Sequence, residues 1–328
     1  MLTEFLQIGI GVAIILVLGD LVIRNAVDLA QTFRLSGAFI GLTVLSLGTS
    51  IPEIMTNLVG SVDILMHPEQ RATVSALVLG TNVGSVVFQQ SFALPVVGLV
   101  GVITVKRREL AEQVGAMLAA AALLWVFCLG GELLRIEGLV MLAAYAVYLL
   151  YLFKHNHVAE HVSHQGSDGR RKTIVAILII VGCFVVIAVV ADQVVAAATR
   201  LVHQLPVSAS FLGVICLGTA STLPELATSL ISILRGQKEI TAGILIGSTV
   251  TNTLVGVGVG GLISGYAVPR VLVFYDLPAM ISIAALLYVF LRRDEDLNRG
   301  EALVLIALFA VYLVLRQHLF PADVAVGG

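Results

Sequence analysis

The stretch Phe39–Ser61, FIGLTVLSLGTSIPEIMTNLVGS, is apolar and long enough to cross a membrane, yet it carries Pro52 and Glu53 near its middle. A charged side chain near the bilayer centre costs about 2.5–3.5 kcal/mol on insertion scales. Proline adds a second cost, because it lacks a backbone donor and clashes with the carbonyl group one turn earlier. Two such costs at adjacent residues indicate a functional site inside the membrane.

The residues around Glu53 predict a site for a hard cation. Thr49, Glu53, Thr56 and Gly60 recur at a spacing that places them on one face of a continuous helix. Hydroxyl, carboxylate and freed carbonyl oxygens are the ligands that calcium and sodium prefer. We therefore expect a cation to bind on this face.

The same pattern occurs a second time. Without a gap, the stretch aligns with Phe211–Ile233, FLGVICLGTASTLPELATSLISI, so that Pro52 meets Pro224 and Glu53 meets Glu225. One intramembrane Pro-Glu pair could be a structural kink with an acid that reaches toward the surface. Two pairs at matching positions of two halves favour an ion pathway instead.

The composition is that of a polytopic membrane protein. Of 328 residues, 58% are hydrophobic and 12% are charged, and the mean hydropathy is +1.01. The net charge is −2, and no basic run suits nucleic acid. The N-terminus, MLTEF, lacks a basic n-region, so we expect the first apolar segment to be retained as a helix. Cys128, Cys183 and Cys216 lie in apolar stretches and are interpreted as packing residues.

Apolar runs of about 17–25 residues predict an all-α membrane protein with ten transmembrane helices. They are expected at Leu6–Ile23, Gly37–Val62, Thr73–Ile103, Leu110–Leu129, Ile136–Phe153, Thr173–Ala191, Val207–Leu234, Ile240–Ile263, Leu272–Leu291 and Glu301–Leu315. Residues 1–153 hold five spans, and residues 173–328 hold another five. Because each half has an odd number of spans, the two halves insert in opposite orientations. The prediction is two inverted five-helix repeats, joined by a cytoplasmic linker over residues 154–172.

Basic residues predict the orientation. The termini and the loops after the even-numbered spans hold Arg71, Arg135, Arg200, Arg270 and Arg316, whereas the other loops hold the remaining fourteen of the 19 Lys and Arg residues. The richer side is expected to be cytoplasmic. Both termini are then outside, in what we expect to be a prokaryotic inner (plasma) membrane.

The linker carries His155, His157, His161 and His164. If the linker is helical, the last three share a face that could hold zinc. Alternatively, it is a solvated connection whose histidines are incidental.

A second motif in each half adds neutral oxygen donors. Leu79–Gln90, LGTNVGSVVFQQ, and Leu245–Asn252, LIGSTVTN, align on their Gly-Ser pairs. Ser85 then aligns with Ser248, and Gln89 aligns with Asn252. These four residues are candidate ligands. Each half therefore offers one glutamate and two neutral oxygen donors.

The paired glutamates also predict a mode of transport. Their two negative charges are balanced equally by one calcium ion, two sodium ions or two protons. Either cation set relieves the same desolvation penalty, whereas the empty, ionised site would hold two buried like charges. This favours antiport over a channel, which needs weaker sites in file.

LGTSIPEIMTNLVGS with GTNVGSVVFQ, and STLPELATSLIS with GSTVTN, resemble the two alpha-repeats of the calcium/cation antiporter superfamily. The GTS-x-PE form resembles the sodium/calcium exchanger branch more than the proton/calcium branch. The resemblance covers both halves. It implies a ten-helix inverted-repeat antiporter with cation sites between spans two, three, seven and eight, and with spans one and six as a sliding gate.

The resemblance also implies a ligand set. The shared carboxylates would be Glu53 and Glu225, and the further oxygen donors would be Thr49, Ser50, Ser221, Thr222, Ser85, Gln89, Ser248 and Asn252. The calcium and sodium ions, with protons as an alternative, are transported and are not cofactors.

The chain departs from the family pattern in the GT of its second repeat, in the amide pair Gln89 and Asn252, and in its short linker. The literal GT of the second repeat is Gly218-Thr219, two residues earlier than in the first repeat, so a local slip would make Thr219 a ligand. Gln89 stands where the family often has Asn or Asp and is more reminiscent of the proton-coupled branch. Asn252 leaves the site without a third carboxylate, which weakens the case for potassium co-transport. The short linker holds no large regulatory domain.

Our hypothesis is a calcium/sodium antiporter that works by alternating access and binds inorganic cations within the bilayer. Proton/calcium antiport keeps the same fold and is the main alternative. Transport of another divalent cation is a further alternative, and a transporter of zinc or another transition metal should have His or Cys at the midplane. A membrane enzyme should carry HExxH or paired aspartates, and neither motif is found. Asp20 and Asp192 are expected near span ends, with a gating role as an alternative.

Overall fold

The computed structural model describes residues 2–33, 35–101, 103, 107–155, 169–202, 211 and 213–320. Its helices are α1 (Leu2–Phe33), α2 (Gly37–Ile40), α3 (Ser46–Thr49), α4 (Ile51–Met66), α5 (Arg71–Phe88), α6 (Leu94–Val100), α7 (Arg107–Cys128), α8 (Arg135–His155), α9 (Gly169–Val202), α11 (Gly218–Ser221), α12 (Leu223–Leu234), α13 (Lys238–Thr251), α14 (Val257–Ser264), α15 (Leu277–Asp294) and α16 (Arg299–Leu319).

Short turns join several of these helices. The π-helical turns are η1 (Gly41–Leu45), η3 (Gln89–Ala93), η4 (Gly213–Leu217), η5 (Asn252–Gly256) and η6 (Leu272–Asp276), and η2 (Pro68–Gln70) is a 3-10 turn. β1 (Glu132–Leu133) pairs antiparallel with β2 (Tyr266–Ala267). π-turns inside helices often mark functional sites, and η3 and η5 begin at two of the predicted ligands, Gln89 and Asn252.

The protein is a helical membrane protein. Within the described ranges, seven helices are long and apolar enough to span a membrane, and two bent helix pairs raise the number to nine. The predicted span Leu110–Leu129 appears as a shorter apolar helix over Glu112–Cys128. Ten spans therefore remain a prediction.

The two bent pairs carry the Pro-Glu motifs. Gly37–Thr49 meets Ile51–Met66 at 43°, and Gly213–Ser221 meets Leu223–Leu234 at the same angle. In each pair the proline lies in the first turn of the second helix, where its missing N–H group costs nothing. The continuous helix face expected from Thr49 to Gly60 is therefore wrong, because the helix ends at Thr49 and restarts at Ile51.

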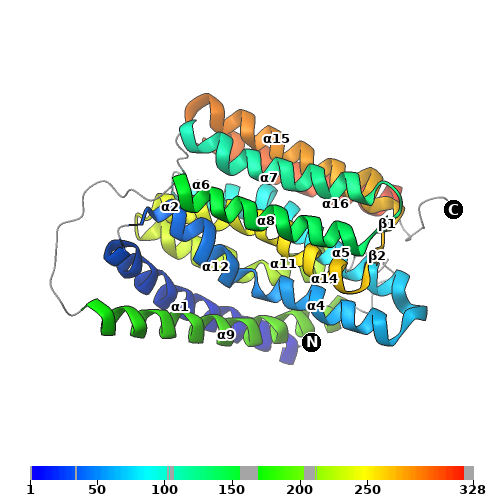
Figure 1. Ribbon diagram of the computed structural model, residues 1–328, viewed down its shortest axis with the longest axis horizontal. Coiled ribbons are helices and arrows are strands. Elements are labelled where there is room, and N and C mark those ends of the chain that lie inside the picture. The colour runs from blue at the N-terminus through cyan, green and yellow to red at the C-terminus, as the bar shows by residue number, and fades with distance from the viewer. Residues whose placement is uncertain are drawn as a thin grey trace.

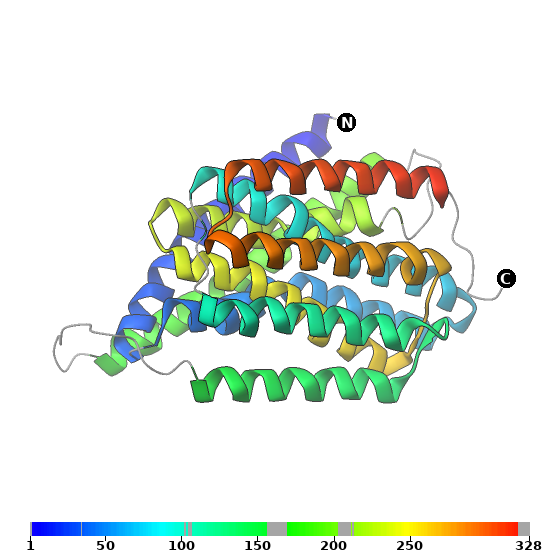
Figure 2. The ribbon, with the colours of Figure 1, turned by 90° about the horizontal axis from the view of Figure 1, so that it is seen from above.

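Helices α1 and α9 pack against each other along the lower edge of Figure 1, and α7 and α15 pack together along the upper edge. The motif-bearing helices α4, α5, α12 and α13 lie between these layers (Figure 1). Figure 2 shows α7, α8, α15 and α16 running roughly parallel, whereas α1 and α9 cross them obliquely. The apolar core has two parts. A large cluster joins the middle and upper helices, whereas α1 and α9 share a separate cluster that includes Ile15, Val22 and Phe184.

The two halves make the same close contact with each other. A Cβ atom on Gly41 would lie 2.6 Å from the carbonyl oxygen of Ile240, and one on its counterpart Gly213 would lie 2.5 Å from that of Leu77. Ile240 and Leu77 are themselves counterparts in the alignment of the second motif. Reciprocal contacts of this kind are typical of a twofold interface. Only glycine lets the backbones approach so closely.

Candidate cation site

The two helix breaks bring Glu53 and Glu225 into the centre of the molecule. Each glutamate lies in the first turn of its helix, α4 or α12, where the helix dipole favours negative charge. Both side chains are completely buried. An intramembrane acid at such a position is a functional site by default.

Ser85 connects Glu53 to the second half. The Ser85 hydroxyl donates to Glu53 Oε1 at 2.8 Å. It accepts from Thr222 Oγ1 at 3.0 Å and from Asn252 Nδ2 at 3.2 Å. Ser221 also lies close enough to act on the Glu53 carboxylate. One hydroxyl therefore joins predicted ligands from α4, α5 and the second repeat.

Glu225 has a different environment. Neither of its carboxylate oxygens accepts a hydrogen bond from the residues that the structure describes. The hydroxyl groups of Thr49 and Ser50 and the carboxylate of Glu53 lie close enough to act on it electrostatically. Thr49 Oγ1 in turn lies 3.2 Å from Ser248 Oγ. The two glutamates thus face one site, each near oxygen donors of the opposite half.

Several buried oxygens around the glutamates have no hydrogen-bond partner. Among the described residues they include Glu53 Oε2, both carboxylate oxygens of Glu225, Ser50 Oγ, Gln89 Oε1 and Asn252 Oδ1. A buried polar group without a partner costs about 1–3 kcal/mol, and more if it is charged. A cation bound among these oxygens would relieve this cost. Oxygen donors of this kind suit a hard cation.

Nine of the ten predicted ligands are connected to one another by the contacts above. Gln89 is the tenth: it is fully buried one turn after Ser85, and neither of its amide atoms has a partner. These contacts involve Ser221 and Thr222, as the ungapped alignment expects, whereas Thr219 is only half-buried. The role of each residue as a ligand remains a prediction.

The charge of the site comes from two carboxylates. In the part of the chain that the structure describes, no group of three or more His, Cys, Asp or Glu side chains could hold a metal ion. The histidines at His157, His161 and His164 lie outside the described residues. His155 ends α8, where a ring nitrogen lies 3.0 Å from the Tyr151 carbonyl oxygen.

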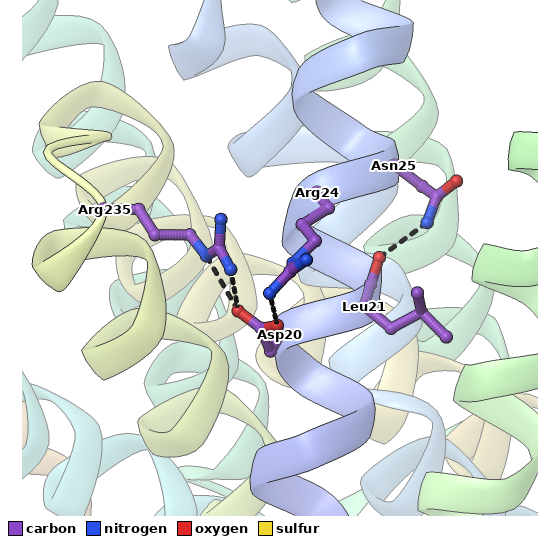
Figure 3. Close-up of polar contacts among 5 residues, drawn as sticks. All are labelled: Asp20, Leu21, Arg24, Asn25 and Arg235. Atoms are coloured by element: carbon purple, nitrogen blue, oxygen red, sulfur yellow. Dashed lines mark hydrogen bonds and ion pairs between the residues drawn. The ribbon is translucent and has the colours of Figure 1, made fainter.

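Asp20 forms an ion pair with the far half (Figure 3). Its carboxylate accepts from Arg235 Nε at 2.8 Å and from Arg235 Nη2 as well, and Arg24 Nη2 lies 2.8 Å away. Asp20 is in the middle of α1, but Arg235 caps the C-terminal end of α12. The pair therefore places Asp20 level with a helix end. The side chain of Asp192 is outside the described part.

Sequence reasoning missed three polar residues beside the site: Asn57, Asn82 and Tyr266. All are buried and bonded to one another or to the backbone of predicted ligands. The position of Asn57, one helical turn after Glu53, was a usable signal. Asn82 and Tyr266 meet their partners only through contacts between distant segments.

Comparisons with known proteins agree with this geometry. A family model described as sodium/calcium exchanger protein matches residues 3–154 and 175–317. The chain is 26% identical to the inner membrane protein YrbG of Escherichia coli, over 95% of this chain and 96% of YrbG. It is 24% identical to the sodium/calcium exchanger MaX1 of Methanosarcina acetivorans, over 96% and 99% of the two chains.

A solved structure of the sodium-calcium exchanger NCX_Mj matches with a TM-score of 0.77 and 21% identity, over 95% of this chain and 97% of that one. At this identity the match shows a shared fold. The family consists of secondary transporters, so the chain is a membrane transporter of inorganic cations and not an enzyme. With its family model matching most of both halves, this chain belongs to the sodium/calcium exchanger protein family.

Proposed function

We propose that this transporter exchanges calcium for sodium across the membrane by alternating access. The observation that supports this most is the set of unpaired, fully buried oxygens around two carboxylates. Calcium takes six to eight oxygen ligands, and the site supplies carboxylate, hydroxyl and amide oxygens in about that number. The related MaX1 is itself named a sodium/calcium exchanger.

Charge balance gives the exchange its physical basis. Glu53 and Glu225 carry two negative charges when ionised, and one calcium ion or two sodium ions neutralise them. The loaded site is neutral in both cases, so it can change its access without moving bare charge through hydrocarbon. The empty site holds two buried like charges, which opposes return without a counter-ion. Calcium and sodium transport are therefore coupled.

The same proposal includes ten spans arranged as two inverted five-helix repeats. The matching 43° bends and the reciprocal contacts of Gly41 and Gly213 support it. Repeats of this type bind their substrate at the interface between halves, where both glutamates lie. The plasma membrane is the proposed location, with both termini outside, since YrbG is an inner membrane protein.

Protons are the second candidate for the counter-ion. Two protons would neutralise the adjacent carboxylates as well as two sodium ions do, and Gln89 resembles the proton-coupled branch. Zinc or another transition metal has less support, because the described site offers oxygen donors and those metals prefer His and Cys.

Flux in proteoliposomes tests the proposal. Purified wild-type protein is reconstituted, and calcium uptake is measured while sodium, potassium and pH gradients are imposed separately. We expect uptake to follow an outward sodium gradient at fixed pH. Uptake that follows only a pH gradient would show that protons are the counter-ion. Absence of calcium uptake under every gradient would refute calcium transport.

A further inference from the structure

Two buried amides bond to the backbone of two predicted ligands. Asn57 Nδ2 donates to the carbonyl oxygen of Glu53 at 2.9 Å, and Asn82 Nδ2 donates to that of Asn252 at 2.8 Å. Asn57 and Asn82 are each 1% exposed. Glu53 Oε2 and Asn252 Oδ1 are both unpaired oxygens of the site. Each amide thus fixes the main chain of a residue whose side chain faces the cation.

Tyr266 fixes the orientation of Asn57. The tyrosine hydroxyl lies 3.1 Å from Asn57 Oδ1 as a donor and 2.9 Å from Ser61 Oγ. Ser61 in turn donates to the carbonyl oxygen of Gly260 at 3.0 Å. Because the hydroxyl donates to Oδ1 of Asn57, Nδ2 of the same amide points toward the carbonyl group of Glu53. A Cβ atom on Gly260 would overlap the tyrosine hydroxyl, so glycine provides its room.

The two amides meet at Gly256, which ends the π-turn η5. A Cβ atom on Gly256 would lie 2.7 Å from Asn82 Nδ2 and 3.4 Å from Asn57 Nδ2. The turn begins at Asn252, so both amides pack against the segment that presents this ligand. Asn57, Asn82 and Tyr266 are called the amide cluster below.

Among the described residues, the matching positions of the other repeat carry no such cluster. The positions that match Asn57 and Asn82 are Ser229 and Leu245, and Gly256 and Tyr266 are matched by Ala93 and Ile103. Ser229 is fully buried and its hydroxyl has no partner. Threonines at equivalent positions bond within their own helices in both halves. The cluster therefore joins residues of both halves at one place and is not repeated by the symmetry of the two halves.

We propose that the amide cluster is a positioning device that holds the Glu53 and Asn252 side of the cation site in its binding geometry. The inference rests on the proposed function. Ligands that are already in place lose little conformational freedom when they bind. Partners that orient metal ligands typically change metal affinity by about 10–100-fold when they are removed. The cluster thus sets the affinity for calcium, whereas Glu53 and Asn252 supply the oxygens.

Two single variants test the inference in proteoliposomes made from the full chain. Asn82→Leu introduces the residue of the matching position, and Tyr266→Phe removes one hydroxyl. We expect the calcium concentration for half-maximal exchange to rise about tenfold and about threefold, with the maximal rate unchanged. Tyr275→Phe is the matched control, because its hydroxyl bonds to the Tyr312 backbone at 2.8 Å, away from the site. It should leave both values unchanged.

A double-mutant cycle tests whether Tyr266 acts through Asn57. Tyr266→Phe should have no further effect on half-saturation in an Asn57→Leu background, because the amide that the hydroxyl orients is gone. An equal effect in both backgrounds would overturn this role. Unchanged half-saturation in Tyr266→Phe and Asn82→Leu, with only lowered thermal stability, would overturn the whole inference.

Failure of the proposed function has a different signature. In that case wild-type protein and Tyr275→Phe would not exchange calcium, and the same half-saturation comparison is made with the cation that they do transport. If Asn82→Leu fails to reconstitute, Tyr266→Phe carries the test, because it removes only a single oxygen atom.

Discussion

The two glutamates have the same place in their repeats but different surroundings. Glu53 Oε1 accepts a hydrogen bond from Ser85, and its backbone is bonded by Asn57. Glu225 has no hydrogen bond to either carboxylate oxygen. The repeat therefore specifies where two acids meet, while contacts that differ between its two copies decide how firmly each is held. We infer a fixed ligand in the first half and an adjustable one in the second.

The strongest way to break this comparison is to remove either charge. Glu53→Gln and Glu225→Gln should each abolish exchange, with at least a hundredfold loss of rate, because one remaining carboxylate cannot neutralise a divalent ion in a buried site. Flux in proteoliposomes measures the loss, and size-exclusion chromatography confirms that each variant still inserts and folds. Full transport in either variant would remove that residue from the site.

The serines sharpen the comparison. Ser85→Ala should raise the half-saturating calcium concentration about tenfold, because Glu53 loses a charge-assisted hydrogen bond worth about 1.5–3 kcal/mol. Ser248→Ala loses only the contact with Thr49 and should cost about threefold. Calcium titrations of exchange compare the two variants. Equal losses would show that the halves are held alike.

Exchanging the amide ligands should change ion preference more than rate. Gln89→Asn shortens the side chain by one methylene group and makes the first half resemble the second, which has Asn252 at this place. We expect a few-fold change in the ratio of sodium to calcium half-saturation, since cavity size and ligand reach determine selectivity. Unchanged selectivity would count against a ligand role for Gln89.

The smallest effect is expected at the Asp20–Arg235 ion pair. Its side chains are 31% and 36% exposed, and exposed pairs contribute about 0–1 kcal/mol. Asp20→Asn should therefore change the exchange rate by less than about fivefold, and high salt should reduce the difference from wild type. The matching position to Arg235 is Asp63, which cannot pair with Asp192. An effect as large as that of Glu53→Gln would indicate a gating role instead.

Local patterns were sufficient to predict a helical membrane protein of the exchanger family and to propose the residues of its site. Pro52 and Glu53 predicted a functional site, and the repetition at Glu225 predicted that the two acids would meet, whereas the break between Thr49 and Ile51 was not expected. Thr49 is buried beside the site as expected, although the helix bends by 43° between it and Glu53. The amide cluster could not be predicted, since Asn82 and Tyr266 find partners far away in the chain. Contacts of that kind follow from how the helices pack.

One glycine beside the site has a wider consequence. A Cβ atom on Gly48 would overlap the ring of Phe184. The Phe184 ring of α9 therefore packs over the first helix break, in the space that a side chain at residue 48 would fill. The matching residue is Ala220, whose methyl group denies a neighbouring helix the same depth. The packing over the two helix breaks therefore differs, and we predict that uncoupled ions leak more readily beside Ala220. Gly48→Ala should therefore raise the passive sodium leak of proteoliposomes above that of wild type. The size of the increase measures the effect of one added methyl group on this contact.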